Sequence, residues 1–278
     1  MDIEFAKQTD KQELLRLYDI CFPGEHDYGE YFHNNFWRPE KTLVIRDNGG
    51  IISMVNLLDV RFNAGDEEIE ASYIYAAATD PAHRGKGLMQ KLLEASFELG
   101  DKWGKDLSVL ITENDSLFAF YKKFGYEPSF GVSLISPNDV LPGFMCKVRM
   151  LDSIDCEMME AVYNTASLGR LAVARDIDRF VSIIEEYKEH AFGLFDQAGN
   201  MMAYCLMDES NEEAREVMGI GMEYLLYTCC MDMKTGFGKS LPSGEGDVPI
   251  GCAKALTEKG RQMLLSFSLP PYMNILFN

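Results

Sequence analysis

The residues best suited to chemistry in this chain form a glycine-rich, basic turn at positions 80–89. The turn reads Asp-Pro-Ala-His-Arg-Gly-Lys-Gly-Leu-Met and lies between a strand-like run, residues 73–79, and a helical pattern over residues 88–99. The first turn of a helix presents unpaired N–H groups and the positive end of its dipole to a ligand. A strand, a glycine turn and a helix start in this order predict a site for an anion such as phosphate.

Gly85 and Gly87 lack a Cβ atom, so a phosphate can come within hydrogen-bonding distance of the backbone there. Arg84 and Lys86 add positive charge to the same turn. The spacing does not match two common phosphate motifs. A P-loop requires Gly-Lys followed by Ser or Thr, whereas Gly-Leu-Met stands here. A dinucleotide fingerprint requires a third glycine where this chain has Gln90.

The composition limits the function classes that this chain can belong to. Its 278 residues suit one large domain or two modest ones, and 47% hydrophobic residues are ample for a packed core. The net charge of −18 argues against nucleic-acid binding and against an anionic membrane surface, because both need a basic protein surface. The same charge suits a small cationic substrate. We expect no membrane helix and no signal peptide, since no segment has the required apolar run.

The seven cysteines show neither a Cys-x-x-Cys pair nor a Cys/His spacing typical of metal ligands. Reduced thiols in a cytoplasmic protein explain them most simply. We therefore expect a cytoplasmic location and no metal site, with the neighbours Cys229 and Cys230 acting as packing residues.

The first half of the chain predicts alternating helices and strands around the glycine turn. Asn-Gly-Gly after residue 47 is a strong hairpin signal, and Thr9-Asp10 and Asn114-Asp115 are suitable helix N-caps. The expected helices cover residues 14–18, 28–37, 88–99 and 115–124, and the expected strands cover residues 42–45, 51–60, 69–79, 107–111, 129–135 and 144–150.

The second half repeats the helix-then-hairpin order of residues 10–60 and has no second glycine-rich phosphate turn. We place a domain boundary near residue 150, which gives domains 1–150 and 151–278. The expected elements are helices at 177–184, 222–230 and 259–267, strands at 192–195, 201–207 and 272–277, an unassigned run at 248–256, and a flexible Gly/Ser/Pro segment at 235–247.

Two sequence blocks resemble the GCN5-related N-acetyltransferase (GNAT) superfamily. Residues 80–89 resemble its pyrophosphate loop, Arg/Gln-x-x-Gly-x-Gly/Ala, although Ala82 stands at the first position instead of Arg or Gln. The second block is a helix with Asn, Phe-Tyr and Gly-Phe/Tyr at the family's spacing. It is matched here by Asn114, Phe120, Tyr121, Gly125 and Tyr126.

The resemblance covers residues 1–150 and implies an α/β (α+β) GNAT fold. Such a fold has a mixed, mostly antiparallel central sheet flanked by helices, and residues 151–278 would form a smaller, degenerate GNAT-like α+β module. It also implies acetyl-CoA as co-substrate, with the pantetheine arm paired to a strand edge and the pyrophosphate wrapped by the turn. The implied coenzyme-binding residues are Ala77, Ala78, Thr79, Arg84, Gly85, Lys86, Gly87, Leu88, Met89, Asn114 and Phe120.

In this family an amine attacks the thioester directly, and a tyrosine at the position of Tyr121 protonates the departing thiolate. The alternative for Tyr121 is that its ring only packs in the core. Glu70 is a candidate general base, and its alternative is a solvated strand end. The residues expected to line the acceptor pocket are Phe22, His26, Tyr28 and Tyr31.

The two-module arrangement is reminiscent of the enhanced-intracellular-survival acetyltransferases, although this chain is too short for their third, sterol-carrier-like module. In that group the terminal carboxylate reaches the active site. Here the apolar residues 272–278 favour a docked strand instead.

The sequence thus predicts transfer of an acetyl group from acetyl-CoA to a primary amine of a small molecule or peptide. Two alternatives stay open: another acyl-CoA donor, and a non-catalytic module that binds or senses acyl-CoA. The acceptor and the oligomeric state are not specified by the sequence.

Overall fold

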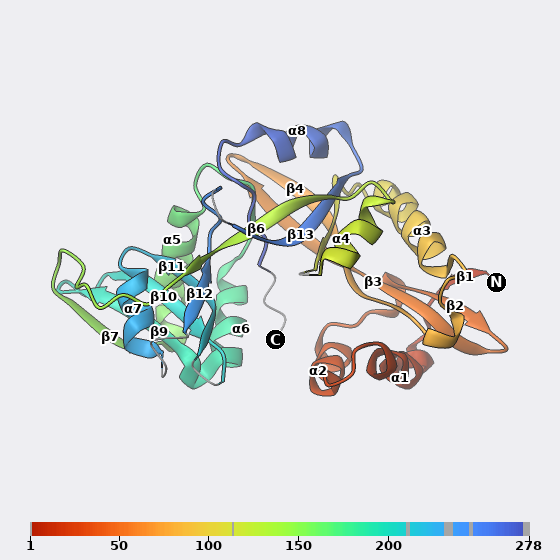
Figure 1. The fold of residues 1–278 in the computed structure, drawn as a ribbon, viewed down its shortest axis with the longest axis horizontal. Coiled ribbons are helices and arrows are strands. Elements are labelled where there is room, and N and C mark those ends of the chain that lie inside the picture. Colours follow the sequence, from red (N-terminus) through yellow and green to blue (C-terminus); the bar gives the residue numbers. More distant parts are fainter. Residues whose placement is uncertain (1, 113, 210–211, 231–235, 245–246, 275–278) are drawn as a thin grey trace.

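The computed structural model describes residues 2–112, 114–209, 212–230, 236–244 and 247–274, which form an arch of strands and helices (Figure 1). The strands are β1 (Ile3–Phe5), β2 (Thr42–Asp47), β3 (Gly50–Ala64), β4 (Glu67–Thr79), β5 (Leu107–Ile111), β6 (Glu127–Ile135), β7 (Cys146–Met150), β8 (Ala172–Val173), β9 (Ala191–Asp196), β10 (Met201–Met207), β11 (Glu213–Gly219), β12 (Phe237–Ser240) and β13 (Val248–Ala255). The helices are α1 (Lys11–Cys21), α2 (His26–Asn35), α3 (Leu88–Lys102), α4 (Asp115–Lys122), α5 (Cys156–Ala166), α6 (Ile177–Tyr187), α7 (Met222–Cys229) and α8 (Glu258–Ser266).

One long sheet connects all of these strands. Its order is β1-β2-β3-β4-β5-β13-β6-β12-β11-β10-β9-β7, and β8 pairs with β3 beside this path. Within the described chain, only the pairs β4–β5 and β11–β12 are parallel, so the sheet is mixed and mostly antiparallel. The predicted fold class is confirmed. No helix of the described chain is long and apolar enough to cross a membrane.

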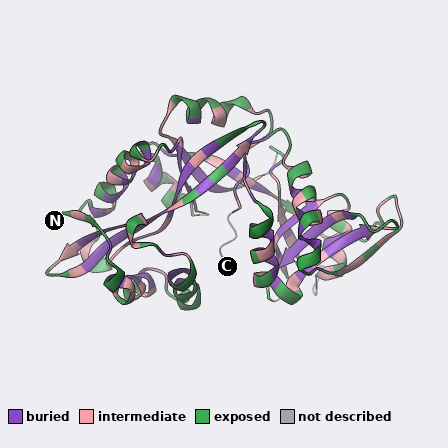
Figure 2. Ribbon diagram, turned by 180° about the vertical axis from the view of Figure 1, so that it is seen from behind, coloured by how far each residue is buried: buried purple, intermediate pink, exposed green. Residues whose placement is uncertain are grey.

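Helices pack on both faces of the sheet in the first half. Since successive residues of a strand point to opposite faces, one strand contributes side chains to both helical layers. On β2, Leu43 and Ile45 pack into the cluster that includes α3. Val44, between them, packs into the cluster of α1 and α2. Figure 2 shows the same pattern across the molecule, with the strands largely buried and the outer faces of the helices exposed.

The second half is held by a buried ion pair. Arg175 donates two hydrogen bonds, of 2.6 and 2.8 Å, to the carboxylate of Glu216 on β11. Tyr204 and Tyr272 donate to the same carboxylate at 2.7 and 2.6 Å. Burial opposes the charge of Glu216, but Arg175 and the donated hydrogen bonds hold its pKa below the ordinary value. This network fixes Tyr272 near the end of the described chain.

Strand β13 returns from the second half of the chain into the sheet of the first half. It pairs antiparallel with β5 on one side and with β6 on the other. The chain continues from β13 into α8, where the Thr257 hydroxyl donates to Asp106 at 2.7 Å, just before β5. The boundary near residue 150 stays a prediction, and the structure adds that residues 248–255 lie between β5 and β6.

Every helix and strand predicted in the first half is present, with ends displaced by a few residues. The flexible segment predicted over residues 235–247 is wrong in part, because Phe237–Ser240 form β12 between β11 and β6. At the predicted strand 272–277, Tyr272 forms a single parallel bridge to Ala172. Residues 275–278 lie outside the described residues. The sequence analysis missed α5, β8 and β11 and the short β1.

Candidate active site

Strand β4 loses its neighbour β5 halfway along its length. Residues Ala71–Tyr73 pair in parallel with Leu107–Val109, and beyond them the described chain places no strand beside β4 on this side. Residues 74–79 line a cavity there, while their other edge still pairs with β3. An unpaired strand edge can hydrogen-bond an extended ligand that carries amide groups.

A β-bulge at Ala76 accompanies this separation. Ala76 has a φ of 47°, in the left-handed region that non-glycine residues rarely adopt. The register between β3 and β4 shifts here, between Met54 and Asn56. A bulge bends its strand and increases the local twist, so β4 turns away from β5 beyond this point.

Polar side chains of β3 hold the bulged part of β4 on its paired side. The Asn56 amide donates to the Tyr75 carbonyl at 3.3 Å, and its oxygen accepts from the Thr42 hydroxyl at 2.8 Å. The Ser53 hydroxyl donates to the Ala78 carbonyl at 2.9 Å. Asn56, Thr42 and Ser53 are all buried, so these hydrogen bonds are shielded from water and keep the bulge in one conformation.

The glycine turn joins the open end of β4 to helix α3. Asp80 begins it by accepting a hydrogen bond from the Ala82 N–H at 2.9 Å. Gly85 and Gly87 have φ angles of 75° and 72°, and Gly87 is the N-cap of α3. A Cβ at either glycine would meet no atom within 4 Å, so open space lies beside this backbone. The structure thus contains the strand, glycine turn and helix start from which the sequence predicts an anion site, and binding of an anion there stays a prediction.

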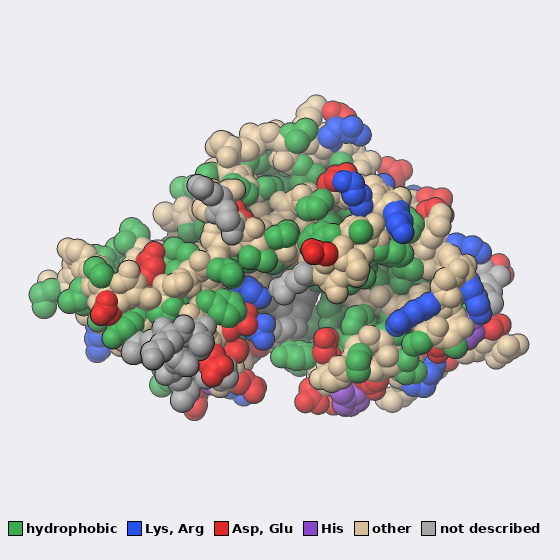
Figure 3. All heavy atoms as spheres, viewed as in Figure 1, with side chains coloured by type: hydrophobic (Ala, Val, Ile, Leu, Met, Phe, Trp, Pro, Cys, Tyr) green, Lys and Arg blue, Asp and Glu red, His purple; other side chains and the backbone are tan. Residues whose placement is uncertain are grey.

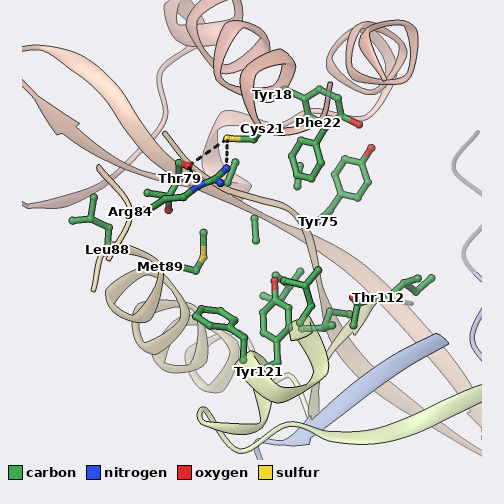
Figure 4. A pocket seen from close by; sticks show the side chains of 18 of the residues that line it. Tyr18, Cys21, Phe22, Tyr75, Thr79, Arg84, Leu88, Met89, Thr112 and Tyr121 are labelled. Atoms are coloured by element: carbon green, nitrogen blue, oxygen red, sulfur yellow. Dashed lines mark hydrogen bonds between the residues drawn. The ribbon is translucent and has the colours of Figure 1, made fainter. Parts of the chain in front are cut away.

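Arg84 is anchored at the boundary between β4 and the turn (Figure 4). Its Nε donates to the carbonyl of Thr79 at 3.1 Å, and the Cys21 thiol donates to the same carbonyl at 3.4 Å. The guanidinium is exposed beside the turn, which places its charge where an anion would bind.

These features border one cavity of about 1070 Å³, which lies between the turn, β4, α4 and the α1–α2 segment. This volume is at the upper end of the range for small-molecule sites and is large enough for a coenzyme. The predicted site residues that line it are Ala77, Ala78, Thr79, Arg84, Gly85, Gly87, Leu88, Met89, Phe120, Tyr121, Phe22 and Tyr28.

Tyr121 on α4 extends its side chain into this cavity (Figure 4). Its ring packs edge-on against Phe120 and Tyr126, with centroids 5.2 and 5.7 Å away. Burial raises the pKa of Tyr121 to about 12. The phenol is therefore protonated at neutral pH, and its O–H can donate a hydrogen bond or a proton to a ligand.

The end of the cavity opposite the turn carries a hydrogen-bonded tyrosine pair. The Tyr18 hydroxyl donates to the Glu25 carboxylate at 3.2 Å and is also hydrogen-bonded to Tyr75 on β4. Burial, then the neighbouring tyrosine and Glu25, raise the pKa of Tyr18. Sequence reasoning missed Tyr18, Glu25 and Tyr75, because contacts between α1, the following loop and β4 leave no local pattern.

Five predicted residues do not line the cavity. Asn114 caps α4 by accepting a hydrogen bond from the Ser116 N–H at 2.8 Å, and the Lys86 side chain is exposed in the glycine turn. His26 is hydrogen-bonded to Asp19 at 2.9 Å. The remaining two residues, Tyr31 and Glu70, also lie outside the cavity lining.

Glu70 and Tyr31 each have a defined environment away from the main cavity. Glu70 accepts a hydrogen bond from Lys105 at 2.7 Å and lines a second, smaller cavity. It lies on the part of β4 before the bulge, opposite Arg61 of β3. Tyr31 packs edge-on against Phe36, with ring centroids 5.6 Å apart.

Comparison with known proteins finds relatives of the first half of the chain, which contains most of the cavity-lining residues. Residues 2–129 match the model of the acetyltransferase (GNAT) domain. An uncharacterized N-acetyltransferase of Methanocaldococcus jannaschii is 29% identical over 137 residues, which is 45% of this chain and 60% of that protein. The match thus spans less than two thirds of that relative's length.

Two solved structures share the fold over nearly the whole chain. A probable N-acyltransferase from Enterococcus faecalis superposes with a TM-score of 0.70 at 13% identity, covering 95% of this chain and 74% of that one. Eis1 from Mycobacterium abscessus superposes with a TM-score of 0.62 at 12% identity, covering 92% and 74%. Residues 2–129, a little less than half of the chain, thus match a GNAT acetyltransferase domain, in agreement with the resemblance seen in the sequence, and nearly the whole chain shares its fold with larger proteins.

The strain at Ala76 gives a testable prediction. Ala76→Gly removes the Cβ from a left-handed residue, whereas Ala77→Gly removes it from an ordinary strand residue one position along. We expect Ala76→Gly to be more stable than Ala77→Gly by about 1–2 kcal/mol, the cost of left-handed backbone for an L-residue. Urea unfolding of both variants measures the difference. Equal stabilities would show that the backbone at residue 76 is not strained.

Proposed function

We propose that this chain is an N-acetyltransferase that transfers an acetyl group from acetyl-CoA directly to a primary amine of a small molecule or peptide. The observation that carries the proposal is the meeting of three features in one cavity: the unpaired edge of β4, the glycine turn at the start of α3, and the Tyr121 side chain. All seven cysteines are free and belong to the described residues. Free thiols are compatible with a reducing, cytoplasmic location.

The coenzyme would lie across the turn and along β4. Open space lies where a Cβ would stand at Gly85 and Gly87, so a pyrophosphate can approach the backbone N–H groups of this turn, and Arg84 and Lys86 supply charge. The pantetheine arm contains two amides, which can pair with the free edge of β4. Ala77 and Ala78 have small side chains that allow this close approach.

Tyr121 would act on the departing sulfur. The amine nitrogen attacks the thioester carbonyl, a C–N bond forms, and the C–S bond breaks with its electron pair on sulfur. An acceptor that arrives as an ammonium first loses one proton to solvent, which frees the lone pair; after the attack the nitrogen loses a second proton to solvent, and the sulfur gains one. With a pKa of about 12, Tyr121 stays protonated and directs its O–H at the sulfur as negative charge develops there. Solvent restores any proton that it gives up.

Binding of the coenzyme is tested at Gly87. Gly87→Glu places a carboxylate and a strained backbone where the phosphates should lie. Loss of two charge-assisted hydrogen bonds, with added repulsion, should weaken coenzyme A binding by about 100-fold or more in calorimetry. Gly65→Glu is the matched control, because Gly65 has a φ of 69° and open space but lies in the β3–β4 turn. Unchanged affinity in a folded Gly87→Glu protein, or equal loss in both variants, would refute the site.

Catalysis is tested at Tyr121 by following release of free coenzyme A thiol with a panel of amines. Tyr121→Phe keeps the ring and removes the hydroxyl, so kcat should fall at least ~10-fold while the KM for acetyl-CoA changes little. Tyr126→Phe also removes a buried hydroxyl, one that is bonded to Ser108 at 2.6 Å outside the cavity. It should keep the wild-type kcat.

Two outcomes would contradict the catalytic proposal. A Tyr121→Phe protein with wild-type turnover would show that another group or water assists the leaving thiolate. Tight coenzyme binding without thiol release for any amine would favour the non-catalytic acyl-CoA-binding module instead.

A further inference from the structure

The charged residues that line the cavity differ in number and in origin. Among the described residues that line the cavity, Glu25 is the only acidic one. Of the four basic lining residues, His83 and Arg84 belong to the glycine turn and Lys123 follows α4. The fourth is Arg215, and it alone among the described lining residues comes from beyond residue 124. The second half of the chain thus contributes a guanidinium to a cavity otherwise built by the first half.

Glu25 is held in place on the wall formed by α1 and the loop before α2. The Tyr18 hydroxyl donates to its carboxylate at 3.2 Å, and Tyr18 is fixed in turn by its hydrogen bond to Tyr75 and by its ring contact with Phe22, 4.6 Å between centroids. Glu25 itself is exposed to the cavity. A positioned carboxylate of this kind suits an ammonium group.

Arg215 lies on β11, next to the buried Glu216. Its side chain is 38% exposed, and among the described residues one carboxylate lies within 4 Å of it, that of Glu213, whose oxygen is 3.6 Å from Nη1. This distance is too long for a hydrogen bond, and Lys239 lies closer to the same oxygen, at 3.1 Å. Within the described part of the chain the Arg215 guanidinium thus donates no side-chain hydrogen bond, and it lines the cavity where an anion can bind. Its backbone is fixed, because the Asn274 amide donates to the Arg215 carbonyl at 3.1 Å.

The two walls face each other across a hollow in the surface. Figure 3 shows the hollow below the arch, with basic and acidic side chains together on the wall of the second half and acidic side chains over α1 and α2. In a chain of net charge −18, a cation here is a local exception that attracts an acid group.

We propose that the acceptor is zwitterionic: its ammonium group is recognised by Glu25 and its acid group, a carboxylate or a phosphate, by Arg215. This inference rests on the proposed acetyltransferase activity and narrows its substrate class to amino acids, short peptides or aminoalkyl phosphates. It also gives the second half of the chain a function, because that half supplies the residue that selects the acid group.

The test compares matched acceptors with the full-length wild-type protein. One pair is an amino acid and its carboxamide, and the other is phosphoethanolamine and ethanolamine. Each pair keeps the amine and removes the acid charge. We expect kcat/KM to be about 10- to 100-fold higher for the acid-bearing member of at least one pair, the value of one or two hydrogen bonds to a charged group. The pair that shows the difference identifies carboxylate or phosphate as the recognised acid.

Arg215→Met should abolish this preference by lowering kcat/KM for the acid-bearing acceptor about 10- to 100-fold, while the acceptor without the acid group reacts as in the wild type. Glu25→Gln should lower kcat/KM for both members of a pair. Arg261→Met is the matched control, since Arg261 is an exposed residue of α8 outside the cavity, and it should change neither value.

The possible failures can be told apart. Equal kcat/KM within both pairs, or an Arg215→Met protein that keeps the preference, would overturn this inference and leave the acetyltransferase proposal intact. Absence of coenzyme A binding by calorimetry would overturn the proposed function and this inference with it.

Discussion

The left-handed backbone at Ala76 is the constraint on which the candidate active site depends. A regular β4 would continue its parallel ladder along the rest of β5, and less of its edge would be free. The bulge ends that ladder after Tyr73 and leaves the rest of β4 facing a cavity. Buried hydrogen bonds from Asn56 and Ser53 on the paired side stabilise the strained backbone of the bulge. The same strand thus holds the sheet together on one edge and offers amide-binding groups on the other.

The glycine turn, α4 and β13 are all arranged around the free edge of β4. The glycine turn lies at the end of β4, so its helix N-terminus faces the same cavity as the strand edge. Helix α4 follows β5 and brings Tyr121 to the opposite wall, where burial keeps the phenol protonated. Strand β13 pairs with β5 on its far side, which supports β5 where β4 has left it. The second half also contributes Arg215 to the cavity, so both halves of the chain supply residues to the site.

The sequence predicted the parts of the site that are local in the chain. Gly85 and Gly87 are recognisable because a strand, a turn and a helix follow one another directly, and Tyr121 because its helix carries a spaced motif. Glu70 was a candidate base from its place on β4, but the bulge lies beyond it and Lys105 binds its carboxylate. Glu25 and Arg215 could not be predicted, because they approach the cavity from segments that are distant in sequence. The insertion of β13 between β5 and β6 is hidden for the same reason.

Hydrogen–deuterium exchange of the full-length protein with and without coenzyme A tests the central claim most directly. Amide exchange reports on the backbone groups that the account assigns to the ligand. The account predicts that coenzyme A slows exchange in residues 77–79 on the free edge of β4 and in residues 85–90 of the turn and first turn of α3. It predicts little change in α7 and β7, none of whose residues lines the cavity. Unchanged exchange in both predicted segments at saturating coenzyme, or protection confined to the second half, would contradict it.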